Sequence, residues 1–332
     1  MHPAPFAGAA PFASTRPPLR NTRSKALTCP SHCHVPACSR SRSNFLTPSR
    51  PRPDDSTHRR CTTLPRHAER PSRRIPMNDA VPQAFAHRDD ENERPLLDAL
   101  EVGVRHIEFD MWYMFGQLLV AHDPQDLRPR RTVTRLYLDP LVEAYDSGRL
   151  APTDATWLYV DVKTRAMPAY QAVERLAERY GPWIARPGKP RNGSPIHLVL
   201  TGNRPPYATV DEAQLGWCHY DGRLPHLAKA RNRDTMPIVS DDWGKFTRWR
   251  GAGAMPEQDR RKLRDAVAAA HSEGQLLRFW ATPEKPGPER TTVWTTLLDE
   301  GVDLINTDDL VGLTRFLRER QADAPTSSSS SA

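Results

Sequence analysis

The chain has 332 residues and a formal net charge of +7, from 47 Lys and Arg against 40 Asp and Glu. At about 100–200 residues per domain, this length allows one large domain or two ordinary ones. An integral membrane segment is excluded, because no run approaches the roughly 18 consecutive apolar residues that cross a bilayer.

Positive charge is concentrated before Met77. Residues 1–76 hold 14 Lys and Arg but 3 Asp and Glu, whereas the rest of the chain holds 33 and 37. A nucleic-acid-binding fold presents a basic face, and the mildly acidic remainder offers none. Nucleic acid is therefore not an expected partner of the body of the chain.

Residues 1–76 are rich in Pro, Arg and Ser and show no apolar periodicity, so we expect them to be disordered. They lack the apolar stretch of a secretory signal, which favours a cytoplasmic location. Two origins stay open. The Arg- and Ser-rich, acid-poor composition resembles an organellar transit peptide. The favoured interpretation is that Met77 is the real start, because the interpretable pattern begins within ten residues of it.

The cysteines also lie mostly in this segment. A zinc knuckle is disfavoured there, because zinc ligands usually recur at tight spacings such as C-x2-C and these spacings are loose. The body holds a single cysteine, so no disulfide forms within it. The residues concerned are Cys29, Cys33, Cys38 and Cys61, with His32 and His34, and in the body Cys218.

From residue 81 onward, short apolar runs alternate with amphipathic stretches. Predicted strands cover 83–87, 104–110, 117–121, 158–162, 196–200, 215–219, 237–240, 276–280 and 302–306. Predicted helices begin at 95 and cover 168–180, 256–271, 292–300 and 309–320. About eight strand–helix units over this length are typical of one (β/α)8 TIM barrel, an α/β fold. We expect it to span 77–322, followed by a disordered Ser-rich tail over 323–332. A doubly wound open sheet is the alternative, but no Gly-rich phosphate turn follows the first strand.

Candidate chemical groups gather at or just past the carboxyl ends of the first three strands, which is the active face of a barrel. These groups are His87, Arg88, Glu108, Asp110, His122, Asp161 and Lys163. Residues i and i+2 on a strand face the same way, so Glu108 and Asp110 project together into the barrel mouth. Their mutual repulsion would be relieved by a shared divalent cation, with Asp161 as a third oxygen ligand. An all-carboxylate set suits Mg2+ or Ca2+ rather than zinc.

The two histidines complete a reaction site in this interpretation. His87 and His122 flank the expected cation and can act as general base and general acid near neutral pH. Lys163 and Arg88 add positive charge for an anionic group such as a phosphate. Any one of these residues alone would more often be structural, but their combination at adjacent strand ends favours a site.

Several segments together resemble the glycerophosphodiester phosphodiesterase-like superfamily, which also contains phospholipase C-like enzymes. The first of them are 86–100, 107–110 (Ile-Glu-Phe-Asp) and 120–123 (Val-Ala-His-Asp). The likeness is closer to the branch of altered inheritance of mitochondria protein 6, through 131–141, 221–224, 278–282 and 301–309. The resemblance covers nearly the whole body and none of residues 1–76.

This resemblance implies a TIM-barrel phosphodiesterase with one divalent cation. By the likeness, the acid/base pair is His87 and His122, the metal ligands are Glu108, Asp110 and Asp161, the phosphate-side lysine is Lys163, and Trp280 is an aromatic wall of the pocket. Three positions depart from the pattern. Asp89 stands where glycerophosphodiesterases usually have Gly, and Arg88 where the nearer branch tends to have Asn. Asp161 replaces a common Glu, a choice also seen in the sphingomyelinase D group.

We therefore expect a metal-dependent phosphodiesterase acting on a glycerophosphodiester or a phospholipid headgroup. The attacking group is either water or a neighbouring substrate hydroxyl, which would yield a cyclic phosphate. One alternative is a non-catalytic barrel that binds a phosphorylated ligand or a protein partner. A second is an Arg-rich nucleic-acid binder working through residues 1–76.

Overall fold

The computed structural model describes residues 79–189, 193–208, 216–227 and 233–323. The expected disorder of 1–76, the cysteine cluster in it and most of the 323–332 tail lie outside the described residues. Cys218 is buried and carries a free thiol. Among the described helices, none is both long and apolar enough to cross a membrane.

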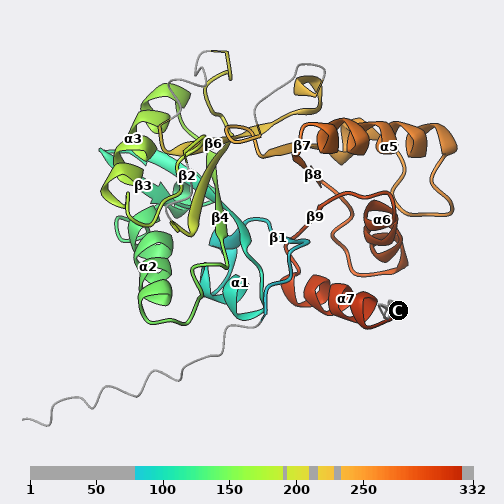
Figure 1. Ribbon diagram of the computed structural model, residues 1–332, viewed down its shortest axis with the longest axis horizontal. Coiled ribbons are helices and arrows are strands. Elements are labelled where there is room, and N and C mark those ends of the chain that lie inside the picture. Colours follow the sequence, from blue (N-terminus) through green and yellow to red (C-terminus); the bar gives the residue numbers. More distant parts are fainter. Residues whose placement is uncertain (1–78, 190–192, 209–215, 228–232, 324–332) are drawn as a thin grey trace, which may run out of the picture. The chain divides into compact units, whose positions relative to one another are not determined.

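The strands form a closed barrel with one additional strand (Figure 1). Eight parallel strands follow one another around it, and the first pairs with both the second and the last, which closes the sheet. In order, they are β1 (Ala84–Ala86), β2 (His106–Met114), β4 (Thr156–Val162), β5 (Ile196–Gly202), β6 (Cys218–Gly222), β7 (Ile238–Asp242), β8 (Leu276–Trp280) and β9 (Leu304–Thr307). The ninth strand, β3 (Gln117–Val120), pairs antiparallel with the end of β2. The predicted TIM barrel is confirmed.

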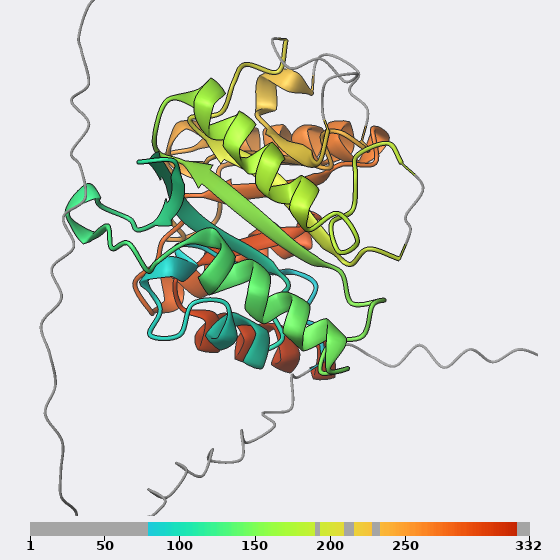
Figure 2. The same ribbon diagram turned by 90° about the vertical axis from the view of Figure 1, so that its left-hand side faces the viewer.

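Helices cover the outside of the barrel. In Figure 2, α2 and α3 flank β4. The helices are α1 (Leu97–Glu101), α2 (Asp139–Asp146) with a π-helical turn before it (Thr134–Leu138), α3 (Ala166–Arg179), α4 (Trp243–Phe246), α5 (Glu257–Ser272), α6 (Pro288–Asp299) and α7 (Leu310–Asp323). Short 3-10 turns lie at Asp89–Glu91, Pro124–Asp126 and Leu224–His226.

Two apolar regions hold these layers together. The larger packs the outer faces of the strands against the helices. The smaller fills the barrel interior, where Phe85, Tyr159, Val199, Ile238 and Leu304 meet. Because side chains alternate along a strand, every second residue from this interior layer also points inward. The inward-facing rows therefore continue from apolar residues to polar ones at the carboxyl ends.

One difference from the sequence prediction lies at the fifth barrel strand, β6. The prediction placed it at 215–219, whereas β6 runs from Cys218 to Gly222. Its inward positions are His219 and Asp221, both buried. Buried polar residues inside a strand remove the apolar pattern on which the prediction rests, so the boundary shifted by three residues.

Candidate active site

Strand register brings the three predicted carboxylates together. Glu108 and Asp110 are successive inward residues of β2, and Asp110 is in register with Asp161 on the neighbouring β4. Glu108 and Asp110 are buried. Burial raises the pKa of Asp110 to about 6, with a further rise from the charge of Asp161. Burial also raises the pKa of Asp161, and the charge of Glu108 adds to that shift.

Two cationic side chains compensate this negative charge. Lys163 Nζ lies 2.9 Å from Asp161 Oδ2 and 3.1 Å from Asp110 Oδ1, so it bridges the two carboxylates. Glu108 Oε2 accepts a hydrogen bond from Nη1 of Arg278, which is 1% exposed. All three predicted metal ligands therefore already have a cationic partner.

Each predicted catalytic histidine is held by a carboxylate through Nδ1. His122 Nδ1 donates to Asp110 Oδ2 over 2.6 Å, and His87 Nδ1 donates to Asp308 Oδ1 over 2.7 Å. Burial by itself would lower the pKa of His87, but the hydrogen bond to Asp308 and the charge of Glu108 bring it above its ordinary value. With Nδ1 engaged, Nε2 is the atom of each ring that remains for proton exchange with a ligand.

The two residues after His87, Arg88 and Asp89, lie in different environments. Arg88 adopts a left-handed backbone conformation (φ 47°), and its half-exposed side chain lies 3.8 Å from Glu91. Asp89 is fully buried, and its carboxylate accepts from the backbone N–H of Leu96 and from Asn92 Nδ2. Asp89 thus fixes the loop behind the site, whereas the charge of Arg88 acts on Asp308, whose pKa it helps to lower.

Trp280 ends β8 and is partly exposed, as an aromatic wall of a pocket would be. One face of its ring is covered by the guanidinium of Arg223, whose Cζ lies 4.7 Å from the ring centroid. The ring of Trp280 at the barrel mouth is therefore already in contact with a cationic side chain, that of Arg223.

Sequence reasoning missed two residues of this site, Arg278 and Asp308. Arg278 lies two positions before Trp280 on β8 and so faces the same side, inside an otherwise apolar strand. An arginine in such a run is the signal that could have identified it, since a buried charge needs a partner. Asp308 directly follows β9, at the same edge as the other candidate residues.

The donor chemistry fits a hard divalent cation, although the side chains are not arranged as a ready-made metal centre. The charge of Asp161 helps to raise the pKa of Asp110, and the charge of Glu108 helps to raise the pKa of Asp161, which is the condition that a cation relieves. However, Lys163 spans two of them, and among the described residues no group of three or more His, Cys, Asp or Glu side chains is arranged to hold a metal ion. Metal binding would require Lys163 to shift or to share these oxygens.

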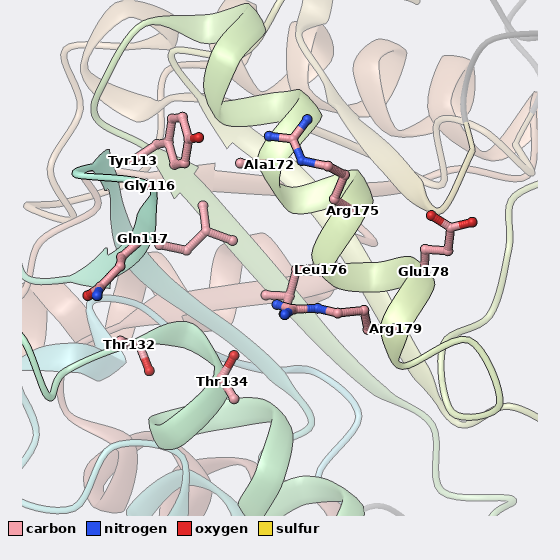
Figure 3. Close-up of a pocket in the computed structure, with 11 residues that line it drawn as sticks. Tyr113, Gly116, Gln117, Thr132, Thr134, Ala172, Arg175, Leu176, Glu178 and Arg179 are labelled. Atoms are coloured by element: carbon pink, nitrogen blue, oxygen red, sulfur yellow. The ribbon is translucent and has the colours of Figure 1, made fainter. Parts of the chain in front are cut away.

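A separate hollow of about 790 Å³ lies on the outer flank of the barrel, between the β2–β3 hairpin and α3 (Figure 3). Arg175 and Arg179 of α3 stand on one side of it, and Gln117 and Thr132 stand on the other. None of the candidate site residues lines this hollow, so it is not the place of the chemistry predicted above.

Comparison with known proteins supports the resemblance seen in the sequence. The model of the AIM6-like phosphodiesterase domain matches residues 76–149, a stretch that includes both candidate histidines, Glu108 and Asp110 but ends before Asp161, Lys163 and Trp280. Altered inheritance of mitochondria protein 6 of Eremothecium gossypii is 25% identical over 276 residues, covering 70% of this chain and 69% of that protein. The homolog from Arthroderma benhamiae is 24% identical over 239 residues, covering 64% of this chain and 74% of that protein.

Among solved structures, a glycerophosphodiester phosphodiesterase from Parabacteroides distasonis aligns with a TM-score of 0.42 and 15% identity, covering 74% of this chain and 100% of that one. The matches to the family model and to the two relatives confirm the resemblance to the branch of altered inheritance of mitochondria protein 6.

Proposed function

We propose that this chain is a metal-dependent phosphodiesterase that cleaves a glycerophosphodiester or a phospholipid-like diester at the barrel mouth. The observation that carries the proposal is the pairing of two histidines with two carboxylates beside a three-carboxylate cluster. Similarity to the AIM6-like phosphodiesterase domain and to the fungal relatives supports the same reaction class.

In this mechanism, the two histidines carry out the proton transfers. Asp308 and Asp110 each accept the Nδ1 proton of one ring, which fixes the tautomer that presents Nε2 to the substrate. One Nε2 takes the proton of the attacking hydroxyl or water, and the other protonates the leaving oxygen. Whether the first product is a cyclic phosphate depends on which nucleophile is used.

The carboxylates Glu108, Asp110 and Asp161 would hold one Mg2+ or Ca2+, which supplies Lewis-acid polarisation of a non-bridging phosphate oxygen when bound. Lys163 bridges Asp110 and Asp161 and would pair with the phosphate once it leaves these carboxylates. Arg88 and Trp280 complete the proposed substrate contacts.

The test is hydrolysis of bis(p-nitrophenyl) phosphate and of glycerophosphodiesters by the full chain, first with EDTA and then with Mg2+ or Ca2+ restored. We expect metal-dependent turnover that falls at least about 100-fold in His87→Ala and in His122→Ala, the lower end of what acid/base groups contribute. The matched control is His271→Ala, because His271 also bonds an aspartate, Asp303, but does so on the surface at the end of α5. Wild-type rates in both site variants would refute the assigned roles.

A non-catalytic barrel is the second candidate, and the bridging position of Lys163 favours it, because an ammonium already compensates Asp110 and Asp161. Under that alternative, no diester is turned over with any metal. Titration calorimetry would then also record no Mg2+ or Ca2+ binding, while phosphate-bearing ligands would still bind. Calorimetry and the hydrolysis assay together separate the two candidates.

A further inference from the structure

The aromatic ring at the barrel mouth is held in a cationic environment. Arg223 Nη1 donates to Asp221 Oδ2 and to the carbonyl of Gly222, both over 2.7 Å, while its guanidinium covers Trp280. These contacts use one nitrogen. No residue of the described ranges accepts from Nη2 or Nε of Arg223, so these N–H groups remain available to a ligand.

A second arginine lies beside Asp221 and is bonded to the backbone there. Arg204 donates to the carbonyl oxygens of Gly202 and Asp221, and its Cζ lies 4.5 Å from the ring centroid of Tyr220. Burial would raise the pKa of the fully buried Asp221, but the charges of Arg223, Arg204 and Arg278 hold it below its ordinary value. The single carboxylate of Asp221 therefore interacts with the charges of both Arg223 and Arg204 on this side of the mouth.

The loop that follows Trp280 carries one more cation, Lys285, together with two carboxylates, Glu284 and Glu289. A hollow of about 610 Å³ is lined by residues 281–283 and 285–289, including Lys285 and Glu289, and by Arg250 from the segment after α4. The same loop carries Glu284, which accepts from Thr307 Oγ1 and from the backbone N–H of Asp308. Because Asp308 holds His87, the loop that forms this hollow also borders the proposed reaction centre.

We propose that the barrel mouth selects a diester whose headgroup carries a negative charge, such as a carboxylate or a second phosphate, and discriminates against a quaternary ammonium headgroup such as choline. The inference rests on the proposed function and names its substrate class. Trp280 would be the natural platform for a quaternary ammonium ion, but Arg223 already occupies one of its faces. A cationic headgroup placed there would meet like charges, whereas an anionic one gains bidentate partners.

The test compares two phosphomonoesters that differ in the charge of their far end, 2-phosphoglycolate and phosphocholine. Calorimetric titration of the full chain in the presence of Mg2+ gives both dissociation constants. We expect 2-phosphoglycolate to bind at least about tenfold more tightly, which is a modest effect for a charge pair near a protein surface. Equal or tighter binding of phosphocholine, or no binding of 2-phosphoglycolate, would overturn the inference.

Variants of Arg223 test whether this side chain is responsible for the preference for a negatively charged headgroup. Arg223→Gln should lose most of the preference, and Arg223→Lys should keep part of it, because lysine retains the charge but not the two-pronged hydrogen bonding. Arg149→Gln is the control. Arg149 pairs with Glu143 and lies between α2 and the amino end of β4, whereas the proposed site lies at the carboxyl ends of the strands. Melting temperatures identify any variant that fails to fold, and an unchanged preference in folded Arg223→Gln would refute the role of Arg223.

Turnover distinguishes a failure of this inference from a failure of the proposed function. If choline-containing diesters are hydrolysed as fast as anionic ones, the charge selection is wrong while the phosphodiesterase stands. If no diester is hydrolysed but 2-phosphoglycolate still binds preferentially, the proposed reaction is wrong while the charge selection stands.

Discussion

The ion pair between Arg278 and Glu108 provides the sharpest stability prediction, because both partners lie inside the barrel. Arg278 is 1% exposed and Glu108 5%. Beyond Glu108, Arg278 donates to Ser240 Oγ and Asn306 Oδ1, both over 3.1 Å, and its guanidinium stacks 3.9 Å from the centroid of Phe85. Arg278→Met fills similar volume but leaves Glu108 buried without its countercharge. Breaking one side of a buried pair costs about 3–5 kcal/mol, and we expect this loss at pH 7.

The other members of a double-mutant cycle test the same reasoning. Glu108→Gln keeps a hydrogen-bond acceptor for Arg278 and should cost less, about 1–3 kcal/mol. In the double variant the buried charge is gone, so its loss should fall short of the sum of the single losses by roughly 2 kcal/mol. Urea denaturation followed by circular dichroism measures each free energy of unfolding.

An exposed ion pair of the same type is the matched control for this cycle. Arg320 pairs with Asp299 on the surface, where the side chains are 42% and 50% exposed, and Arg320→Met should cost less than about 1 kcal/mol. A loss below about 1 kcal/mol in Arg278→Met as well, or strict additivity of the two single losses, would refute the argument from buried charge.

Three further changes have definite expected outcomes. Asp308→Asn removes the charge that holds His87 and should lower kcat about 100-fold with little change in KM; an unchanged kcat would refute this role. Phe115 and Gly116 form a two-residue hairpin turn with φ values of 52° and 73°, where Asn-Gly is favoured, and Phe115 is 89% exposed. Phe115→Asn should therefore raise the free energy of unfolding by ~0.5 kcal/mol, and a lower melting temperature would contradict it. Burial raises the pKa of Asp89 to about 6, so the folded state prefers the protonated acid and loses up to ~3 kcal/mol as pH rises from about 4 through 6. Asp89→Asn should not show this loss, and parallel urea-unfolding profiles for the two proteins between pH 4 and 7 would refute it.

The grouping of the carboxylates was predictable from the sequence because it depends on local geometry. Alternation along β2 puts Glu108 and Asp110 on one face, and neighbouring parallel strands of a barrel end at one edge. Asp161 needed the pairing of β4 with β2, which follows from their succession in a βαβ unit. His87 and His122 lie just after β1 and β3, so the same edge holds them.

The charge partners were not predictable in this way. Arg278 and Glu108 are 170 residues apart in the chain, and His87 and Asp308 are 221 apart. The first pair forms across the barrel and the second where β1 meets β9, so both depend on the closure of the whole sheet, which periodicity does not specify. A sequence pattern identifies side chains that lie at the same edge of the sheet. Which of them form ion pairs or hydrogen bonds with one another depends on where the charges lie in the folded protein.

Asp89 illustrates how a departure from a family pattern can have a structural cause. Where glycine would leave the loop after His87 without a side chain, Asp89 supplies a buried carboxylate that binds the backbone N–H of Leu96. Leu96 has a φ of 67°, a conformation that costs free energy for a residue with a side chain and persists when its surroundings hold it. Asp89 therefore ties down the segment that follows His87. For this reason, Asp89 does not indicate that the site has lost catalytic function. Whether the chain catalyses a reaction depends on the histidines and carboxylates themselves.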